Sequence, residues 1–273
     1  MSAELELRLR GAVRGMRSAV IAYSGGVDSA LVAAIAHQEL GARALAVTGV
    51  SASLADGELE AAVALAAQIG IAHQTIQTHE FDNESYRANP INRCFFCKEE
   101  LFGALAALAR EGGFEAVADG TNADDGAAPL DVRPGRAAAA AFGVCSPLAE
   151  AGLAKREVRA LARTLELPVW DKPAAPCLSS RIPHGARVEY DALRRVDLAE
   201  RYLRARGFSI VRVRHYGTTA QIEVPLADIA RLRSQQSVLE RSFAEVGYER
   251  VEIDARGYRT GSLNEGAAVT LAD

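Results

Sequence analysis

Three cysteines and one short turn carry the residue types in this chain that could do chemistry. Cys94 and Cys97 have the C-x-x-C spacing, and Cys177 lies far from them between two prolines. Cysteine thiolates act as nucleophiles and as metal ligands. The turn at 24–29 reads Ser-Gly-Gly-Val-Asp-Ser. These residue types predict chemistry on phosphates and on sulfur.

The turn follows an apolar run and precedes a helical pattern, which is where phosphate is bound most readily. Its two glycines let the backbone approach an anion closely, and a helix N-terminus offers N–H groups and a positive dipole end. Its serines add hydroxyl donors, and its aspartate is expected to act through Mg²⁺. The turn has neither the lysine of a Walker A loop nor the Rossmann spacing, and the alternative is a capped tight turn. The predicted ligands are Ser24, Gly25, Gly26, Asp28 (also for Mg²⁺) and Ser29.

The segment around Cys177 is poorly suited to fill a core, because it reads Pro-Cys-Leu-Ser-Ser-Arg-Ile-Pro. A nearby arginine, Arg181, would favour the reactive thiolate. The same side chain would suit a phosphate on a nucleotide or substrate. The alternative is a half-buried structural cysteine. Cys145 follows an apolar, strand-like run at 142–145 and is predicted to be a core residue.

Alternating strands and helices must position these residues in the first two thirds of the chain. This alternation predicts an α/β fold with a doubly wound parallel sheet. The Ala- and Gly-rich segment 124–141 is predicted to be a mobile loop. The predicted strands are Ala19–Tyr23, Ala42–Val50, Ala72–Thr78 and Ala116–Asp119, and the helices are Asp28–Leu40, Asp56–Ile69, Arg93–Glu111 and Lys155–Leu165.

The last third has a different rhythm and predicts a smaller C-terminal α+β domain. The chain is therefore predicted to have a larger α/β domain at 1–170, a cysteine-bearing loop or linker at 171–189, and the smaller α+β domain at 190–273. Arg212 and Arg214 alternate with valines, which places both on one face of a strand. That face would bind a phosphate or a metal, or else be a solvated sheet face. The predicted elements are helices Tyr190–Arg206 and Ser234–Val246 and strands Ser209–His215, Gln221–Val224 and Arg250–Asp254.

Composition restricts the class of protein. The chain has 273 residues, 49% of them hydrophobic, and a net charge of −4, which indicates a globular protein and argues against a general nucleic-acid binder. It has no apolar run long enough to span a membrane. Its first 17 residues carry charges throughout, which predicts an amphipathic helix in a cytoplasmic protein rather than a signal peptide.

Three stretches in the right order resemble the PP-loop ATP pyrophosphatases. Ser24–Ser29 matches their SGGxDS signature, Asp119–Asp125 matches a nucleotide- and metal-contacting segment, and Ser146-Pro147-Leu148 followed by Lys155 resembles their closing segment. This resemblance implies that ATP is split into AMP and pyrophosphate. It adds Thr121 and Asn122 to the predicted ATP-binding residues.

Nearly the whole chain, including 172–183 and 257–264, is similar to the LarE family of sulfur transferases. That resemblance implies adenylation of the carboxylates of pyridinium-3,5-biscarboxylic acid mononucleotide and replacement of AMP by sulfur, for a nickel-pincer cofactor. It further implies a homo-oligomer and a possible sulfur-delivery protein, with a small-molecule partner and no nucleic acid or membrane. The predicted catalytic residues are Cys177, Asp28 and Arg181, and the predicted substrate-binding residues are Ser180, Glu200, Arg212, Arg214 and Glu223.

The source of the sulfur divides this family into two branches. In one, a single cysteine matching Cys177 gives up its own sulfur. In the other, three cysteines hold a 4Fe–4S cluster, and Cys94, Cys97 and Cys177 favour that branch here. Structural zinc would need four ligands, and a redox dithiol lacks its usual context. Other functions weighed are a tRNA thiolase, an amide-forming ligase like NAD synthetase, and a nucleotide sensor.

Overall fold

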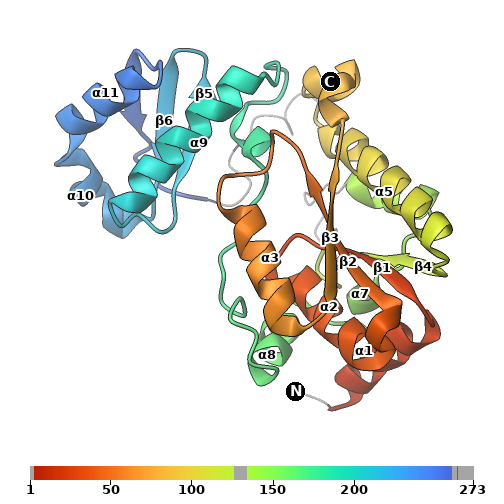
Figure 1. Ribbon diagram of the computed structural model, residues 1–273. Helices are drawn as coiled ribbons and strands as arrows, with labels where there is room; N and C mark the ends of the chain where they lie inside the picture. Colours follow the sequence, from red (N-terminus) through yellow and green to blue (C-terminus); the bar gives the residue numbers. More distant parts are fainter. Residues whose placement is uncertain (1–2, 126–133, 260–262, 264–273) are drawn as a thin grey trace, which may run out of the picture. The chain divides into compact units, whose positions relative to one another are not determined.

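The computed structural model describes residues 3–125, 134–259 and 263, which fall into two compact units (Figure 1). The first comprises residues up to 83 together with 92–175, and the second comprises 84–91 together with the residues from 176 onward. The chain therefore passes between the units at 83/84, 91/92 and 175/176. The segment 171–189, expected to be a loop or linker, belongs to the first unit up to 175 and to the second from 176.

The first unit contains a parallel sheet of four strands in the order β3-β2-β1-β4. Strand β1 lies between β2 and β4, and helices cover both of its faces, so its short run of Ala, Val and Ile is buried. This confirms the predicted α/β fold with a parallel sheet. The strands are β1 (Ala19–Ala22), β2 (Ala44–Val50), β3 (Ala72–Gln77) and β4 (Ala116–Ala118).

Helices cover both faces of this sheet, and β1 divides its side chains between them. Ala19 and Ile21 join a core that includes residues of α1, α2, α3, α7 and α8, whereas Val20 joins a core made with α5 and α6. This is the alternation expected of a strand. The helices are α1 (Ala3–Gly15), α2 (Val27–Leu40), η1 (Gly41–Arg43), α3 (Glu58–Ile69), η2 (Glu80–Asp82), α5 (Arg93–Gly112), α6 (Gly135–Ala141), α7 (Pro147–Glu150) and α8 (Lys155–Thr164).

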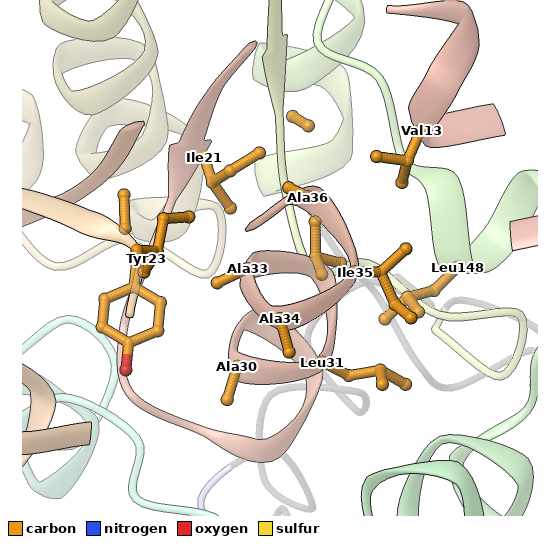
Figure 2. Close-up of a cluster of buried hydrophobic side chains, with 14 of the residues drawn as sticks. Val13, Ile21, Tyr23, Ala30, Leu31, Ala33, Ala34, Ile35, Ala36 and Leu148 are labelled. Atoms are coloured by element: carbon orange, nitrogen blue, oxygen red, sulfur yellow. The ribbon is translucent and has the colours of Figure 1, made fainter. Parts of the chain in front are cut away.

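Helix α2 is the centre of the first core. It is apolar around most of its circumference, which is the pattern of a fully enclosed helix. Figure 2 shows Ala30, Ala33, Ala34 and Ala36 along it, with Leu31 and Ile35 between them. Alanines allow close packing on several sides at once. The beginning of α2 is thereby held at the carboxyl end of β1.

The predicted mobile loop at 124–141 is wrong in its last part. Residues 135–141 form helix α6, and residues 126–133 lie outside the described part of the chain. A run of alanines has the highest helix propensity of any composition, and Ala138 and Ala139 are buried in the core shared with α5. The apolar run at 142–145 contributes one β-bridge, between Cys145 and Ala118, and Cys145 is half-buried.

The second unit confirms the predicted smaller domain with its own sheet and core. Strands β5 and β6 form an antiparallel hairpin, and β7 pairs parallel with β6. The core contains Leu203, Phe208, Val213, Ile222 and Phe243. The elements are α4 (Glu84–Arg87), η3 (Leu178–Arg181), α9 (Tyr190–Ala205), β5 (Arg212–Tyr216), β6 (Thr219–Glu223), η4 (Leu226–Asp228), α10 (Ile229–Arg233), α11 (Gln236–Glu245) and β7 (Arg250–Ile253).

A search of the described residues for membrane spans finds no helix with the length and apolar character needed to cross a bilayer.

Candidate active site

The predicted phosphate turn lies where β1 gives way to α2. Gly25 has a φ of +70°, and a Cβ there would stand 2.9 Å from the Cβ of Ala62 on α3. Both facts require glycine at this position. Gly26 is the extended residue before α2, and within the described chain no side chain caps the helix. The first N–H groups of α2 are therefore presented at an open turn, which is the geometry of an anion site.

The two serines of the turn close it on itself. The Ser24 and Ser29 hydroxyl oxygens are 3.1 Å apart, and the Ser24 N–H donates to Ser29 Oγ over 3.1 Å. The Ser29 hydroxyl donates in turn to the Gly26 carbonyl over 3.1 Å. We interpret the serines as residues that shape the turn. The N–H groups at the beginning of α2 are the donors that the turn leaves open, and phosphate binding by Ser24 and Ser29 stays a prediction.

The loop after β4 packs directly against this turn. A Cβ added at Gly120 would lie 2.8 Å from the backbone nitrogen of Ser29, so glycine is needed for the approach. Asp119, which is buried, accepts hydrogen bonds from the Thr121 N–H at 3.0 Å, the Thr121 hydroxyl at 2.7 Å and the Ser146 hydroxyl at 2.8 Å. Thr121, predicted to contact ATP, is thus held by Asp119.

Asp28 lies at the centre of a polar cluster drawn from three segments of the first unit. Its Oδ1 accepts from the Asn122 side-chain amide over 3.3 Å, and its Oδ2 contacts the Lys155 ammonium group. The Lys155 N–H donates to Asp124 over 2.7 Å, which fixes the beginning of α8 on the same loop. In the sequence, Lys155 lies in a family-like segment, and no role is predicted for it there. The fold brings it to Asp28.

Cys177 is exposed at the beginning of η3, in a loop that we define as residues 176–189 and call the Cys177 loop. Arg181, only 1% exposed, donates to the Cys177 carbonyl over 3.0 Å. It also forms a bidentate pair with Glu200 of α9, at 2.8 and 2.9 Å. Arg181 therefore fixes the backbone of the Cys177 loop through a buried carboxylate.

The hairpin residues meet the same loop. Arg214 donates to the Ser180 carbonyl over 2.9 Å and pairs with Glu223 over 2.7 Å. Arg212 stacks on the Tyr258 ring, with its guanidinium carbon 5.3 Å from the ring centroid. Both arginines are 6% exposed, so the alternative of a solvated sheet face is wrong. The predicted substrate-binding residues Ser180, Glu200, Arg212, Arg214 and Glu223 come together in the second unit.

The cysteines are divided between the units. Cys94 and Cys97 lie near the beginning of α5, three residues apart, which places them on neighbouring positions of one helix face. They belong to the first unit and Cys177 to the second. Within the described residues, no group of three or more His, Cys, Asp or Glu side chains is gathered as a metal site. Burial, followed by the charges of Glu150 and Asp119, raises the pKa of the Cys145 thiol, which keeps that thiol protonated and unreactive.

A parallel sheet with an uncapped Ser-Gly-Gly-Val-Asp-Ser turn between β1 and α2 defines the first unit as a PP-loop ATP pyrophosphatase domain. Comparison with known proteins agrees, since the NAD synthase family matches residues 2–92. The chain is 33% identical over 258 residues, 94% of its length, to the pyridinium-3,5-bisthiocarboxylic acid mononucleotide synthase of Lactiplantibacillus plantarum, of which the match covers 92%. The chain therefore belongs to the LarE family.

Two further relatives match over similar lengths. An uncharacterized protein of Synechocystis is 49% identical over 248 residues, which cover 90% of this chain and 91% of that protein. An uncharacterized protein of Methanocaldococcus jannaschii is 25% identical over 241 residues, covering 88% and 90%. Both units are thus shared with these relatives.

Replacement of Gly25 by alanine tests the turn. We expect Gly25→Ala to destabilise the protein by about 1–3 kcal/mol and to weaken ATP binding at least about tenfold, because φ is positive and Ala62 lies too close. Gly113→Ala is the matched control, since Gly113 has a left-handed φ of +70° but nothing within 4 Å of an added Cβ. It should cost about 1 kcal/mol and leave ATP binding unchanged. Urea unfolding and calorimetric titration with ATP measure both, and equal ATP affinity in the two variants would contradict the model of the turn.

The Arg181–Glu200 pair predicts a pH dependence of stability. Burial raises the pKa of Glu200, but the hydrogen bond and charge of Arg181 outweigh this, with help from Arg204 and the Val213 N–H, so the pKa falls below its ordinary 4.5. A lowered folded-state pKa stabilises the fold above the unfolded-state pKa, and that stabilisation is lost as pH falls through the folded-state value.

We expect Glu200→Gln to lower the free energy of unfolding by about 3–5 kcal/mol at pH 7, since Arg181 is left buried without its counter-ion. The difference from wild type should hold down to about pH 4.5 and shrink below it. Urea unfolding across pH measures it. Glu249→Gln, at an exposed carboxylate in the same unit, is the control. A difference that grows on acidification would refute the assignment.

Proposed function

We propose that the protein is an ATP-dependent sulfur transferase that converts the carboxylates of pyridinium-3,5-biscarboxylic acid mononucleotide into thiocarboxylates. The relationship to the synthase of the bisthiocarboxylic acid mononucleotide, at 33% identity over 94% of the chain, carries this proposal. The open turn before α2 supports ATP as the activating reagent, and the exposed Cys177 thiol supports sulfur chemistry.

In the adenylation step, a substrate carboxylate oxygen attacks the α-phosphorus of ATP and pyrophosphate leaves. The N–H groups at the beginning of α2 would hold the departing phosphates. Asp28 would hold Mg²⁺, because its carboxylate supplies the hard oxygen ligand that this ion prefers and it stands beside the turn. Lys155, whose ammonium group contacts Asp28, would lie close to the departing phosphates and help to neutralise their negative charge.

Buried positive charge in the second unit supports binding of the substrate phosphate there. The arginines of this cluster are Arg181, Arg212 and Arg214, which are buried, and Arg204, which is half-buried, and they lie beside the buried carboxylates Glu200 and Glu223. Burial, and then the charge of Arg181, lowers the pKa of Arg212. A phosphate near Ser180 would suit the guanidinium groups of Arg212 and Arg214, whose planar N–H donors match phosphate oxygens.

Sulfur then attacks the acyl carbon of the adenylate, and AMP leaves with the electron pair of the broken bond. Cys94, Cys97 and Cys177 would hold a 4Fe–4S cluster, and its iron without a cysteine ligand would carry an additional sulfide for transfer. The donor chemistry fits a cluster, because Cys94, Cys97 and Cys177 are all free thiols. Cys94 and Cys97 also share one face of α5. The alternative uses Cys177 itself. Its thiolate forms a thioester, a base removes its α-proton, and the Cβ–S bond breaks to leave thiocarboxylate and dehydroalanine.

Separating the two half-reactions tests the function. With ATP, Mg²⁺ and the dicarboxylate mononucleotide, wild type should release pyrophosphate and give a product with sulfur in place of oxygen. Cys177→Ser should release pyrophosphate in its first turnover within about twofold of wild type, yet lose the sulfur product about a hundredfold or more. Cys145→Ser is the control and should behave as wild type. Substrate-dependent amide formation from ammonia, or no pyrophosphate with the dicarboxylate, would contradict the proposal.

Iron and acid-labile sulfide distinguish the two sulfur sources. After anaerobic reconstitution we expect about four irons per chain in wild type and in Cys145→Ala, with loss in Cys94→Ala and Cys177→Ala. Repeated turnover should disappear with the iron. A wild type without iron that ends as dehydroalanine at residue 177 would instead establish the single-use cysteine, and full repeated turnover by Cys94→Ala would contradict the cluster.

A further inference from the structure

Residues 84–91 form a short insertion that belongs to the second unit although both flanking segments belong to the first. We call it the brace segment. It begins with the one-turn helix α4, and after residue 92 the chain enters α5. Neither its composition nor its spacing marked it as functional in the sequence.

The Cys177 loop needs support from outside itself. It includes Pro176 and Pro183, and its regular structure within the described chain is the single turn η3. A loop of this kind has few internal hydrogen bonds to hold one conformation, so its shape depends on bonds from neighbouring segments. Arg214 of β5 supplies such a bond at the Ser180 carbonyl, and Glu200 of α9 holds Arg181, which donates to the Cys177 carbonyl within the loop.

Asn89 of the brace segment supplies further hydrogen bonds to the loop, at residues 182–186. It is fully buried and has a φ of +55°, a left-handed conformation that asparagine tolerates better than most residues. Its side-chain nitrogen donates to the carbonyls of Ile182, Pro183 and Ala186 at 3.3, 2.8 and 2.9 Å. Its own carbonyl accepts from the Gly185 N–H over 2.9 Å. Asn89 therefore holds residues 182–186 of the loop through both its side chain and its backbone.

Tyr86 contacts the loop nearer to the cysteine in the sequence than Asn89 does. Its hydroxyl is 2.7 Å from the hydroxyl of Ser179, and both residues are buried, at 1% and 0% exposure. Ser179 lies in η3, two residues after Cys177. At the other end of the loop, the Val188 N–H donates to the Arg87 carbonyl over 2.8 Å. The brace segment thus contacts the loop from Ser179 to Val188, while the Cys177 side chain stays exposed.

We propose that the brace segment positions the Cys177 loop for sulfur transfer, with Tyr86 and Asn89 as its positioning residues. The inference rests on the proposed function. It assigns these residues to the step in which sulfur reaches the adenylate and not to adenylation, whose proposed ATP-binding residues lie in the first unit. The same segment leads into the first turn of α5, so the backbone that holds the Cys177 loop continues within five residues from Asn89 to Cys94.

Tyr86→Phe tests the inference because it removes one hydroxyl and keeps the ring. We expect pyrophosphate formation and the KM for ATP to stay within about twofold of wild type, while sulfur product per pyrophosphate falls about tenfold, since a displaced loop misplaces the reacting group. Tyr248→Phe is the matched control. Tyr248 is also a buried tyrosine of the second unit, 2% exposed, and its hydroxyl lies 3.1 Å from His215 Nδ1. It should leave the ratio of product to pyrophosphate unchanged.

Asn89→Gly distinguishes the contribution of the side chain from that of the backbone. Glycine can keep the left-handed φ, but it removes the side-chain amide that donates to the three carbonyls. It should lower the same ratio at least as much as Tyr86→Phe. An unchanged ratio in both variants, or an equal fall in Tyr248→Phe, would overturn the inference.

Hydrogen–deuterium exchange of the peptide 177–188 gives a readout that does not depend on the proposed function. Exchange should rise about tenfold in Tyr86→Phe and not in Tyr248→Phe. Unchanged exchange in Tyr86→Phe would overturn the inference whatever the activity. Faster exchange with an unchanged ratio would also overturn it. If wild type makes no sulfur product at all, the proposed function fails, and the exchange result alone decides whether the segment holds the loop.

Discussion

A phosphate can be held at the beginning of α2 only if the chain leaves β1 without placing a side chain in its way. Gly25 meets this requirement through a positive φ and a contact with Ala62 too close for a Cβ. Gly120 meets it on the other side, where the loop after β4 touches the Ser29 nitrogen. The alanines of α2 allow the helix to pack closely within the core that holds its first turn in place. Much of the first unit follows from keeping this one helix end open and fixed.

The second unit is organised by a different constraint, which is buried charge. Arg181 and Glu200 are both inaccessible, and such a pair is tolerable only when its hydrogen-bonding groups are satisfied. Glu200 accepts from Arg181, Arg204 and the Val213 N–H, so the carboxylate joins α9, β5 and the Cys177 loop. Removal of either partner would leave an uncompensated charge. The pair therefore fixes backbone geometry beside the cysteine, which is a role that an exposed ion pair would not have.

The two kinds of chemistry are assigned to different units of the chain. In the proposed reaction, activation of a carboxylate would use the turn, Asp28 and Lys155, which belong to the first unit, whereas Cys177 and the buried arginines belong to the second. Residues 84–91 contribute to the second unit from within the sequence of the first. Such an insertion gives two separately folded cores a structural connection besides a single linker.

The sequence by itself determined the parallel α/β fold, the position of the phosphate turn and the family. These depend on local patterns, namely apolar strands, helix periodicity and a Ser-Gly-Gly-Val-Asp-Ser turn whose residue types suit one backbone path. It also placed Arg212 and Arg214 on one strand face, because strand alternation is local. It missed helix α6, where an alanine run was taken for a mobile loop and its burial against α5 was not visible.

Only the tertiary structure decided which partners these residues have. Lys155 reaches Asp28 across 127 positions of sequence, and Tyr86 reaches Ser179 across 93. Nothing in the local sequence of Tyr86 or Asn89 indicates contact with the Cys177 loop, because such contacts arise when distant segments pack together. The local sequence also could not predict that Arg181, Arg212 and Arg214 are buried. A charged residue on a strand or loop is solvated unless a carboxylate distant in the sequence compensates its charge.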